Sequence, residues 1–399
     1  MTASRARFEA LYALAFLGVH LAFMPLFVLL LPRRVAAIEP DDSVSTLSLL
    51  LLIGGIAASV GHIAAGHLSD RQLARHGSRR AVIAAGLVLL LASYAGLALA
   101  RSAPALAITI VFYQLALNLM FAPLGALITD YVENARKGRV AGWMNLALPL
   151  SSGGIAVVGF LFADDGWKAF ALVAIMVAIT VLPLLIAWPV GPLLDAAERP
   201  RDRPATARRI ADFRLAWAAR LCVQFGAFGV TSYLFLYVQT AGGSATDPSR
   251  AVAVLSSAAL VIALGATLLS GYASDWLYRR RVPVAIAAIA CALALAGLAA
   301  FPVFAVIVGL YALFHFGLAA FIAIDTALVA QLVAGLTNRG TLLGFMNLAN
   351  TLPAIVLPAM ALAVAGVVAP GQMLGGMLWI LAAGALLAAA AMLRIRSVD

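Results

Sequence analysis

Long runs of apolar residues, broken by short polar stretches, repeat along the whole 399-residue chain. Each run holds about 20 or more mostly apolar residues, the length that an α-helix needs to cross a membrane core of about 30 Å. The other spanning structure, a β-barrel, would show short strands of alternating polarity. The sequence therefore predicts an all-α membrane protein with twelve transmembrane helices, at residues 8–31, 44–68, 81–100, 105–130, 140–162, 169–190, 213–239, 251–273, 282–300, 303–334, 341–368 and 373–393.

The longest polar stretch of the chain, at residues 191–212, divides these runs into six and six. We expect residues 1–190 to form an N-terminal six-helix bundle and residues 213–399 a C-terminal one, with 191–212 as a cytoplasmic linker between them. The apolar run that begins near Phe8 follows a short, weakly basic start without a small-residue cleavage site, so we interpret it as a first span and not as a signal peptide.

Composition and charge exclude several classes of protein. Hydrophobic residues make up 64% of the chain and charged residues 11%, against about a quarter charged in soluble domains, which excludes a soluble enzyme and a disordered chain. With both termini in the cytoplasm, the inner loops and ends would hold 21 of the 27 Lys and Arg residues and the outer loops five. This bias fits a bacterial-type inner membrane, and it explains the net charge of +10 without nucleic acid.

Two short motifs occur once in each half of the chain. The segment Gly66-His-Leu-Ser-Asp70 recurs as Gly271-Tyr-Ala-Ser-Asp275, and Gly142-Trp-Met-Asn145 recurs as Gly344-Phe-Met-Asn347. The offsets are 205 and 202 residues, so the two matches are collinear. Parallel repeats of this kind are the architecture of the major facilitator fold, with two pseudo-symmetric six-helix bundles.

The loop after the second span resembles a family signature. It contains Gly66, Asp70, Arg71, Gly77, Arg79 and Arg80, and it is similar to the loop between spans 2 and 3 of major facilitator transporters. The seven-residue step from Asp70 to Gly77 resembles the glycoside–pentoside–hexuronide:cation symporters and related proton-coupled sugar carriers. The resemblance implies an ion-pair latch between the two bundles, with Asp275 as its symmetric counterpart. The alternative is an ordinary solvated, basic inner loop. We further expect Gly66 to allow two helices to approach closely.

The source of energy follows from what the sequence lacks. The second span holds Ser48, Ser59 and His62 but no carboxylate, which argues against a sodium site. No phosphate-binding GxxxxGK[ST] motif is present, so ATP is not expected to drive the protein. The two cysteines, Cys222 and Cys291, lie in apolar runs without metal-binding spacing. We therefore expect protons as the coupling ion, and no cofactor or metal.

Candidate substrate-binding residues lie in spans 4 and 7, which line the central cavity in this fold. Gln114 and Asn118 are one turn apart, with Tyr113 adjacent, and Gln224 and Tyr233 are polar positions of span 7. Amides suit sugar hydroxyls because each can both donate and accept. The alternative for the amides is a hydrogen bond between helices inside one bundle.

The ionisable groups deep in the spans are candidates for proton coupling. Asp325 is the carboxylate placed deepest, by count about twelve residues or roughly 18 Å from the end of its span. We predict that Asp325 is the coupling site and that His20, midway along span 1, is its partner across the cavity. The alternative is a structural hydrogen bond from Asp325 to Asn347 or Asn350. For Arg220, near the start of span 7, two interpretations stay open: a side chain that reaches back to the membrane surface, and a pair with a cavity acid.

The sequence thus predicts a monomeric secondary transporter that takes up a small polar solute, a sugar or glycoside, with protons by alternating access in a lipid bilayer. It is not expected to be an enzyme. Proton-linked export of amphipathic compounds is the alternative, kept open by Pro149 to Gly154 in span 5, which loosely resembles an antiporter signature and predicts a kink. A membrane receptor or scaffold without transport is a third hypothesis.

Overall fold

The structure of the chain is a computed structural model that describes residues 2–162, 166–188, 207–241, 247–277, 281–333, 339–365 and 367–396. The chain forms two compact units, Met1–Ala196 and Ala197–Asp399. The first contains α1 (Thr2–Pro25), the π-helical turn η1 (Leu26–Leu30), α2 (Leu31–Ile38), α3 (Ser43–His76), α4 (Arg80–Leu99), α5 (Ala103–Tyr131), α6 (Asn134–Asn145), α7 (Ala147–Leu161) and α8 (Gly166–Ile186). The second contains α9 (Ala207–Ala241), α10 (Pro248–Leu277), α11 (Arg281–Ala300), α12 (Phe304–Leu332), α13 (Arg339–Thr351), α14 (Pro353–Val364) and α15 (Pro370–Leu393).

Within these described ranges, twelve helical stretches are long and apolar enough to cross a membrane. The predicted fold class, an all-helical protein with twelve spans, is confirmed. Nine of the stretches are single helices, and three are composed of consecutive helices: α1, η1 and α2 in the first, α6 and α7 in the fifth, and α13 and α14 in the eleventh.

Prolines account for the three interrupted spans. Proline has no backbone N–H and cannot donate to the carbonyl four residues earlier, so an α-helix loses a bond at each one. The π-helical turn begins directly after Pro25, and α7 begins two residues before Pro149. Pro353 is the first residue of α14. Span 5, for which a kink is predicted, is interrupted at Leu146, and span 11 is interrupted in the same way at Leu352.

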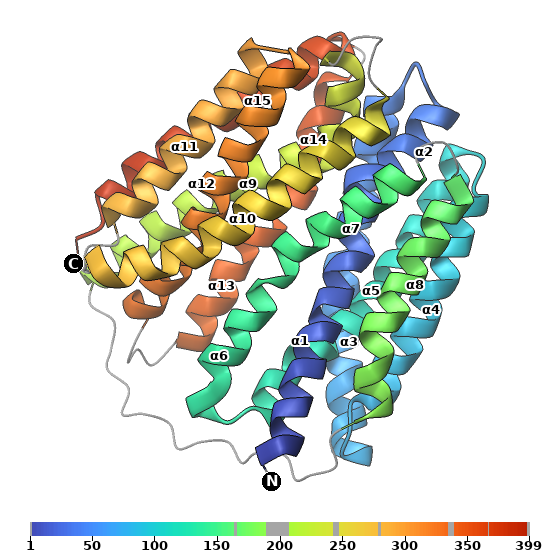
Figure 1. Cartoon of the computed structure of the whole chain (residues 1–399), viewed down its shortest axis with the longest axis vertical. Helices are drawn as coiled ribbons and strands as arrows, with labels where there is room; N and C mark the ends of the chain where they lie inside the picture. The colour runs from blue at the N-terminus through green and yellow to red at the C-terminus, as the bar shows by residue number, and fades with distance from the viewer. Residues whose placement is uncertain are drawn as a thin grey trace. The chain divides into compact units, whose positions relative to one another are not determined.

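The helices of the two units pack in the same order. In the first unit, α5 packs against α3 and α4, α1 packs against α7 and α8, and α4 packs against α8 (Figure 1). In the second, α12 packs against α10 and α11, α9 packs against α13, α14 and α15, and α11 packs against α15. Each unit therefore repeats one arrangement of six spans, as the collinear motifs predict.

Glycines allow the tightest of these helix contacts. A Cβ atom on Gly86 of α4 would lie 2.5 Å from the backbone nitrogen of Met120 on α5. A Cβ atom on Gly317 of α12 would lie 2.8 Å from the carbonyl oxygen of Ala287 on α11. Small residues at such contacts let membrane helices approach until their backbones touch.

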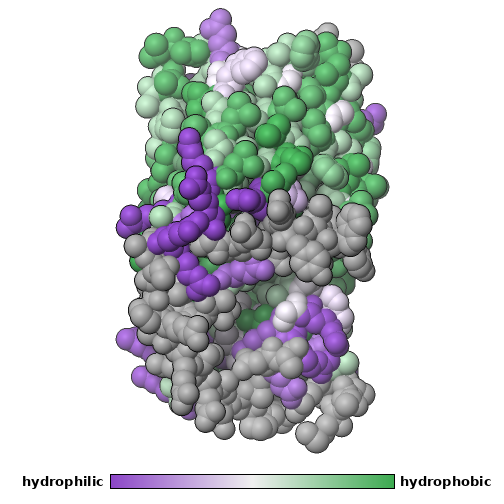
Figure 2. Space-filling model, turned by 90° about the vertical axis from the view of Figure 1, so that its left-hand side faces the viewer, coloured by the Kyte–Doolittle hydropathy of each residue, from purple (hydrophilic) through white to green (hydrophobic). Residues whose placement is uncertain are grey.

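Large apolar side chains also lie on the outside of the helices. Ile63, Leu99 and Ile108 are exposed on the first unit, and Ile286 and Leu387 on the second. Figure 2 shows one face of the molecule, on which hydrophobic side chains cover the upper part and hydrophilic ones gather below. Exposed apolar surface of this extent fits lipid, because lipid tails solvate such side chains and water does not.

Candidate transport site

A polar face on α9 organises the second unit. Trp217, Arg220 and Gln224 follow one another at helical spacings of three and four residues, so they share one face of the helix. Trp217 donates its indole N–H to the carbonyl of Phe345 on α13 at 2.8 Å. The face is therefore held against α13 on either side of Arg220.

Arg220 forms an ion pair with Asp325 of α12. Its Nε and Nη2 atoms both lie 2.5 Å from Oδ2 of Asp325. The Asp325 side chain is 1% exposed and the Arg220 side chain 15%, so the arginine is the accessible member of the pair. The other carboxylate oxygen, Oδ1, is buried and has no hydrogen-bond partner in the part of the chain that the structure describes. An ionised Asp near the bilayer centre costs about 2.5–3.5 kcal/mol on insertion scales, and the guanidinium offsets that cost.

This pair resolves two alternatives that the sequence leaves open. Arg220 does not reach back to the membrane surface, because its guanidinium binds an acid inside the unit. Asp325 does not bond the amides of α13 either: its hydrogen-bond partner is Arg220. The predicted depth of Asp325 is wrong in one respect. α12 ends at Leu332, seven residues beyond Asp325, which corresponds to about 10 Å of helix instead of roughly 18 Å.

A short chain of amides lies one turn further along the same face. Gln224 donates to the side-chain oxygen of Asn350 at 3.0 Å, and Asn350 donates to that of Asn347 at 3.3 Å. Both asparagines are exposed on α13. An exposed amide within a membrane-spanning helix is favourable only where water or a polar solute can reach it. Gln224 thus lies in a polar cluster, whereas Tyr233 is buried and lines a small apolar pocket with Gly229, Tyr237, Leu298 and Met377.

The predicted amides of the first unit are both buried. Asn118 accepts a hydrogen bond from Nδ1 of His62 at 3.0 Å and donates to the backbone of Gln114 at 2.9 Å. Neighbouring Tyr113 is also buried and donates its hydroxyl to the carbonyl of Ala22 at 2.9 Å. Asn118 and His62 connect α5 to α3, so this pair joins two helices as the alternative for the amides supposed.

His20 lies in the first unit and Asp325 in the second, so their predicted pairing stays a prediction. Nδ1 of His20 lies 3.0 Å from the carbonyl oxygen of Phe16, one turn earlier. The His20 ring also lies between those of Phe16 and Phe23, with centroids 5.3 and 5.2 Å away. Each of these contacts is with another residue of α1.

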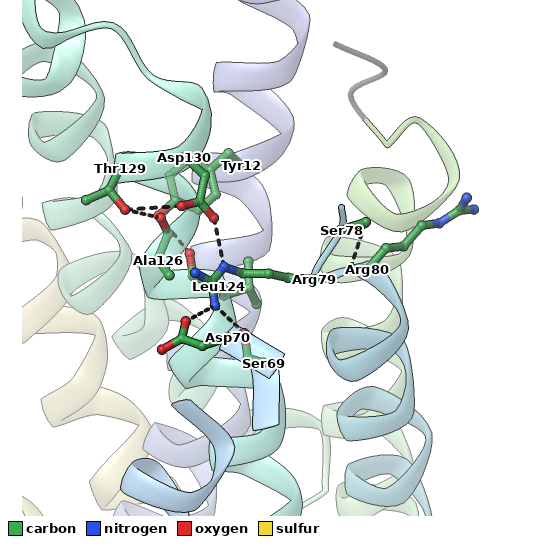
Figure 3. A network of polar contacts seen from close by, with 10 residues as sticks. All are labelled: Tyr12, Ser69, Asp70, Ser78, Arg79, Arg80, Leu124, Ala126, Thr129 and Asp130. Carbon is green, nitrogen blue, oxygen red and sulfur yellow. Dashed lines mark hydrogen bonds and ion pairs between the residues drawn. The ribbon is translucent and has the colours of Figure 1, made fainter. Parts of the chain in front are cut away.

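The residues predicted as a latch contain a compact polar cluster centred on Arg79 (Figure 3). Arg79 donates Nε to Asp130 of α5 at 2.7 Å, and it donates Nη1 to Asp70 at 2.7 Å and to Ser69 at 2.5 Å. Burial opposes the charge on Arg79, but the hydrogen bonds and charges of Asp130 and Asp70 outweigh it and raise the pKa of the guanidinium. The side chains of Arg79 and Asp130 are 8% and 12% exposed, whereas that of Asp70 is 67% exposed.

The other predicted latch residues have different surroundings. Gly77 ends α3 with φ at 65°, a left-handed conformation that glycine adopts without strain, and this turn brings Arg79 back toward Asp70. Arg71 and Arg80 are exposed, and Figure 3 shows the Arg80 side chain pointing away from the cluster. The close approach predicted at Gly66 is not seen, since a Cβ atom there would meet no described atom within 4 Å. The side chain of Asp275 lies outside the described residues.

Sequence reasoning missed Ser69 and Asp130 as hydrogen-bond partners of Arg79, and it left open whether Arg220 pairs with an acid, without naming Asp325 as that acid. A signal for Arg220 was present, because an arginine inside an apolar span normally pairs with an acid in the bundle. The sequence signal for Asp130 is weaker. It is a carboxylate at the end of an apolar run, and it comes near the basic loop only when the chain is folded.

Comparisons with known proteins agree with this architecture. The sequence matches the family model of the Major Facilitator Superfamily over residues 10–358. The chain belongs to the major facilitator superfamily. It is therefore a membrane transporter and not an enzyme, and membership of this family implies that it moves a substrate. No curated protein matches the sequence.

Two solved structures of a superfamily transporter resemble the chain along its whole length. One is a bacterial homolog of the human lysosomal transporter Spinster in an inward-facing, unoccupied conformation, with 15% identity, a TM-score of 0.68 and coverage of 99% of this chain and 98% of that one. The other is the same homolog in an inward-facing, occupied conformation, with 17% identity, a TM-score of 0.67 and coverage of 100% and 97%. At such identities the likeness shows the fold, and the resemblance to sugar symporters stays a prediction.

Proposed function

We propose that this superfamily transporter couples the movement of a small polar solute to protons. In this proposal it works as a monomer in a bacterial inner membrane with both termini in the cytoplasm, and it alternates between inward- and outward-facing states. The single observation that carries the proposal is the ion pair of Arg220 with Asp325. A buried acid within a membrane-spanning helix is energetically costly, and such acids typically serve proton or substrate transport.

The free oxygen of Asp325 gives a proton a place to bind. Oδ2 accepts from Arg220, while Oδ1 is buried and has no partner among the residues that the structure describes. A proton on Oδ1 would neutralise the carboxylate and weaken its hold on Arg220, which loosens α9 from α12. A change of contact between two spans upon protonation is what links a proton to a conformational change.

The amides beside the pair supply a surface for a polar solute. Gln224, Asn347 and Asn350 continue the polar face beyond Arg220, and their groups both donate and accept hydrogen bonds. Such a surface favours uptake of a hydroxyl-rich solute, such as a sugar or glycoside, over export of an amphipathic compound, which would need an apolar lining. The other predicted residues, Gln114, Asn118, Tyr113 and Tyr233, stay candidates, but all four are buried, so the proposal depends chiefly on Gln224.

The cluster around Arg79 would act as the conformational latch. Asp70 is its exposed arm and the member that can leave without uncovering a buried charge, whereas Asp130 anchors Arg79 to α5. In the proposed cycle, the contact of Asp70 changes between states while the pair of Arg79 and Asp130 persists.

Asp325→Asn tests the proposal in liposomes that contain the purified protein and a pH-sensitive dye. The wild type should carry protons inward when a transported solute from a sugar and polyol panel is added, and accumulate that solute under an acid-outside gradient. In Asp325→Asn the size and hydrogen bonding are kept but titration is lost, so accumulation should vanish while exchange of preloaded solute persists. Glu39→Gln is the matched control, because it also removes an acid but lies at the end of α2, in the other unit from Arg220 and Asp325. It should leave accumulation unchanged. Undiminished acid-driven accumulation in Asp325→Asn would disprove the coupling role.

A further inference from the structure

The ion pair of the second unit is isolated from other charges. The stretches 215–239 of α9, 251–273 of α10, 282–300 of α11 and 304–332 of α12 contain two charged residues, Arg220 and Asp325. The other titratable side chains in them are His315, two cysteines and four tyrosines. His315 lies ten residues before Asp325 on the same helix, about 15 Å along its axis, with its ring against that of Tyr311. No second acid of these stretches can therefore compensate Arg220.

Protonation of Asp325 would consequently leave one unbalanced positive charge within the membrane. While Asp325 is ionised, the pair is neutral as a whole. Once Oδ1 takes a proton, the guanidinium keeps its charge, since arginine does not deprotonate in proteins. A neutral solute cannot compensate that charge, whereas an anionic solute restores a net charge of zero. The charge balance of the pair thus distinguishes between classes of solute.

We propose that the transported solute bears a carboxylate, and that this carboxylate binds Arg220 when Asp325 is protonated. This inference rests on the proposed function and adds the chemical class of the solute to it. The proton and the carboxylate then cross together, and the site stays electrically neutral when it is loaded and when it is empty.

The geometry of Arg220 suits this exchange. Nε and Nη2 bind Asp325, while Nη1 has no hydrogen-bond partner among the described residues. Arg220 is also the more exposed member of the pair, so a solute reaches the guanidinium while Asp325 stays behind it. A guanidinium binds a carboxylate through parallel N–H bonds, and the amide of Gln224 lies one turn away to bind the rest of the molecule. A sugar acid would satisfy both the guanidinium and the amides.

The test compares solutes that differ by a carboxylate. The probes are D-glucuronate and D-glucose, L-lactate and propane-1,2-diol, and benzoate and benzamide, each added to the purified full-length protein. Thermal unfolding reports binding, and proton uptake from a weakly buffered solution reports protonation. At least one carboxylate should stabilise the wild type saturably and take up about one proton per molecule bound, while its neutral partner does neither.

Variants assign the effect to the pair. Arg220→Gln should weaken carboxylate binding by about ten- to a hundredfold, the loss expected for a charge-assisted hydrogen-bonded contact. Arg214→Gln, on an exposed position of the same helix, should leave it unchanged. Asp325→Asn should bind the carboxylate without proton uptake, because the site is already neutralised. If that variant does not fold, the comparison of the wild type with Arg220→Gln replaces it: the carboxylate should cause proton uptake by the wild type and little or none by Arg220→Gln.

Three outcomes would overturn the inference: stabilisation by a neutral partner equal to that by its carboxylate, carboxylate binding that survives in Arg220→Gln, or no effect of any carboxylate on the wild type or Asp325→Asn. The proposed function fails separately. A neutral solute that drives proton movement through Asp325 would leave the coupling role intact and refute the carboxylate, whereas carboxylate uptake unaffected by Asp325→Asn would refute the coupling role.

Discussion

Replacement of Arg79 by Gln should destabilise the first unit because it removes the centre of a buried polar cluster. The variant loses hydrogen bonds to Ser69, Asp70 and Asp130 at once. Loss of one partner of a buried ion pair costs about 3–5 kcal/mol, and loss of an exposed one about 0–1 kcal/mol. The Asp130 carboxylate is 12% exposed and keeps its charge without a partner, so we expect Arg79→Gln and Asp130→Asn each to cost about 2–4 kcal/mol.

The same argument sets a small value for the exposed arm of the cluster. The Asp70 side chain is 67% exposed, so Asp70→Asn should lower the free energy of unfolding by less than about 1 kcal/mol. If Asp70 serves the proposed latch, this variant nonetheless transports more slowly than the wild type. In Asp70→Asn the transport rate would then fall while stability is nearly unchanged, whereas in Arg79→Gln both would fall.

Denaturant unfolding of the purified protein in detergent, followed by circular dichroism, measures these values. Arg80→Gln, an exposed neighbour of the same charge, is the control and should change little. The double variant of Arg79 and Asp130 should cost less than the sum of the single ones, because both remove one interaction. Equal losses in Arg79→Gln and Arg80→Gln, or strict additivity in the cycle, would refute the reasoning.

Two further variants test the helix packing and the second predicted proton group. Gly317→Ala should destabilise the second unit by about 1–3 kcal/mol, because its new methyl group would meet the backbone of α11, whereas Gly309→Ala on the same helix has open space around it and should be neutral or stabilising in unfolding experiments. His20→Gln should shift the pH dependence of uptake in liposomes without abolishing accumulation, and an unchanged pH profile would remove His20 from the coupling path.

The spans could be predicted from the sequence because each one is a local property. An apolar run of sufficient length between polar loops has one stable form in a bilayer, and prolines such as Pro149 mark where it breaks. The residues that meet across the bundle could not be predicted in this way. Asp325 and Arg220 are both recognisable as buried ionisable groups, but the rotation of α9 against α12 decides that they meet, and hydropathy does not encode that rotation.

The Arg79 cluster shows the same limit in another form. The basic loop and Asp70 are contiguous in sequence, so a charge cluster there was predictable. Its true centre depends on the left-handed turn at Gly77, which directs Arg79 inward, and on Asp130, which lies 51 residues away in sequence. The sequence therefore predicted the place of the cluster and not which arginine joins it.

The first unit holds different side chains at the two positions that match the ion pair by sequence offset. Phe16 of α1 and Phe121 of α5 precede Arg220 and Asp325 by 204 residues each, an offset between the 205 and 202 of the repeated motifs. The two phenyl rings contact each other with centroids 5.8 Å apart. The first unit thus fills with two aromatic side chains the position at which the second unit holds two charges. We therefore expect that the second unit does not need these two charges for folding.

This comparison leads to a variant that separates stability from function, the double replacement Arg220→Phe with Asp325→Phe. A buried ion pair replaced by apolar residues that fill its space is often neutral or more stable by about 1–4 kcal/mol, whereas each single replacement leaves an unpaired buried charge and should cost about 3–5 kcal/mol. The double variant should therefore unfold at a denaturant concentration at or above that of the wild type, yet show no proton-coupled transport in liposomes. If it unfolds as readily as the single variants, the pair is needed for folding, and the argument that its charges are kept for transport is wrong.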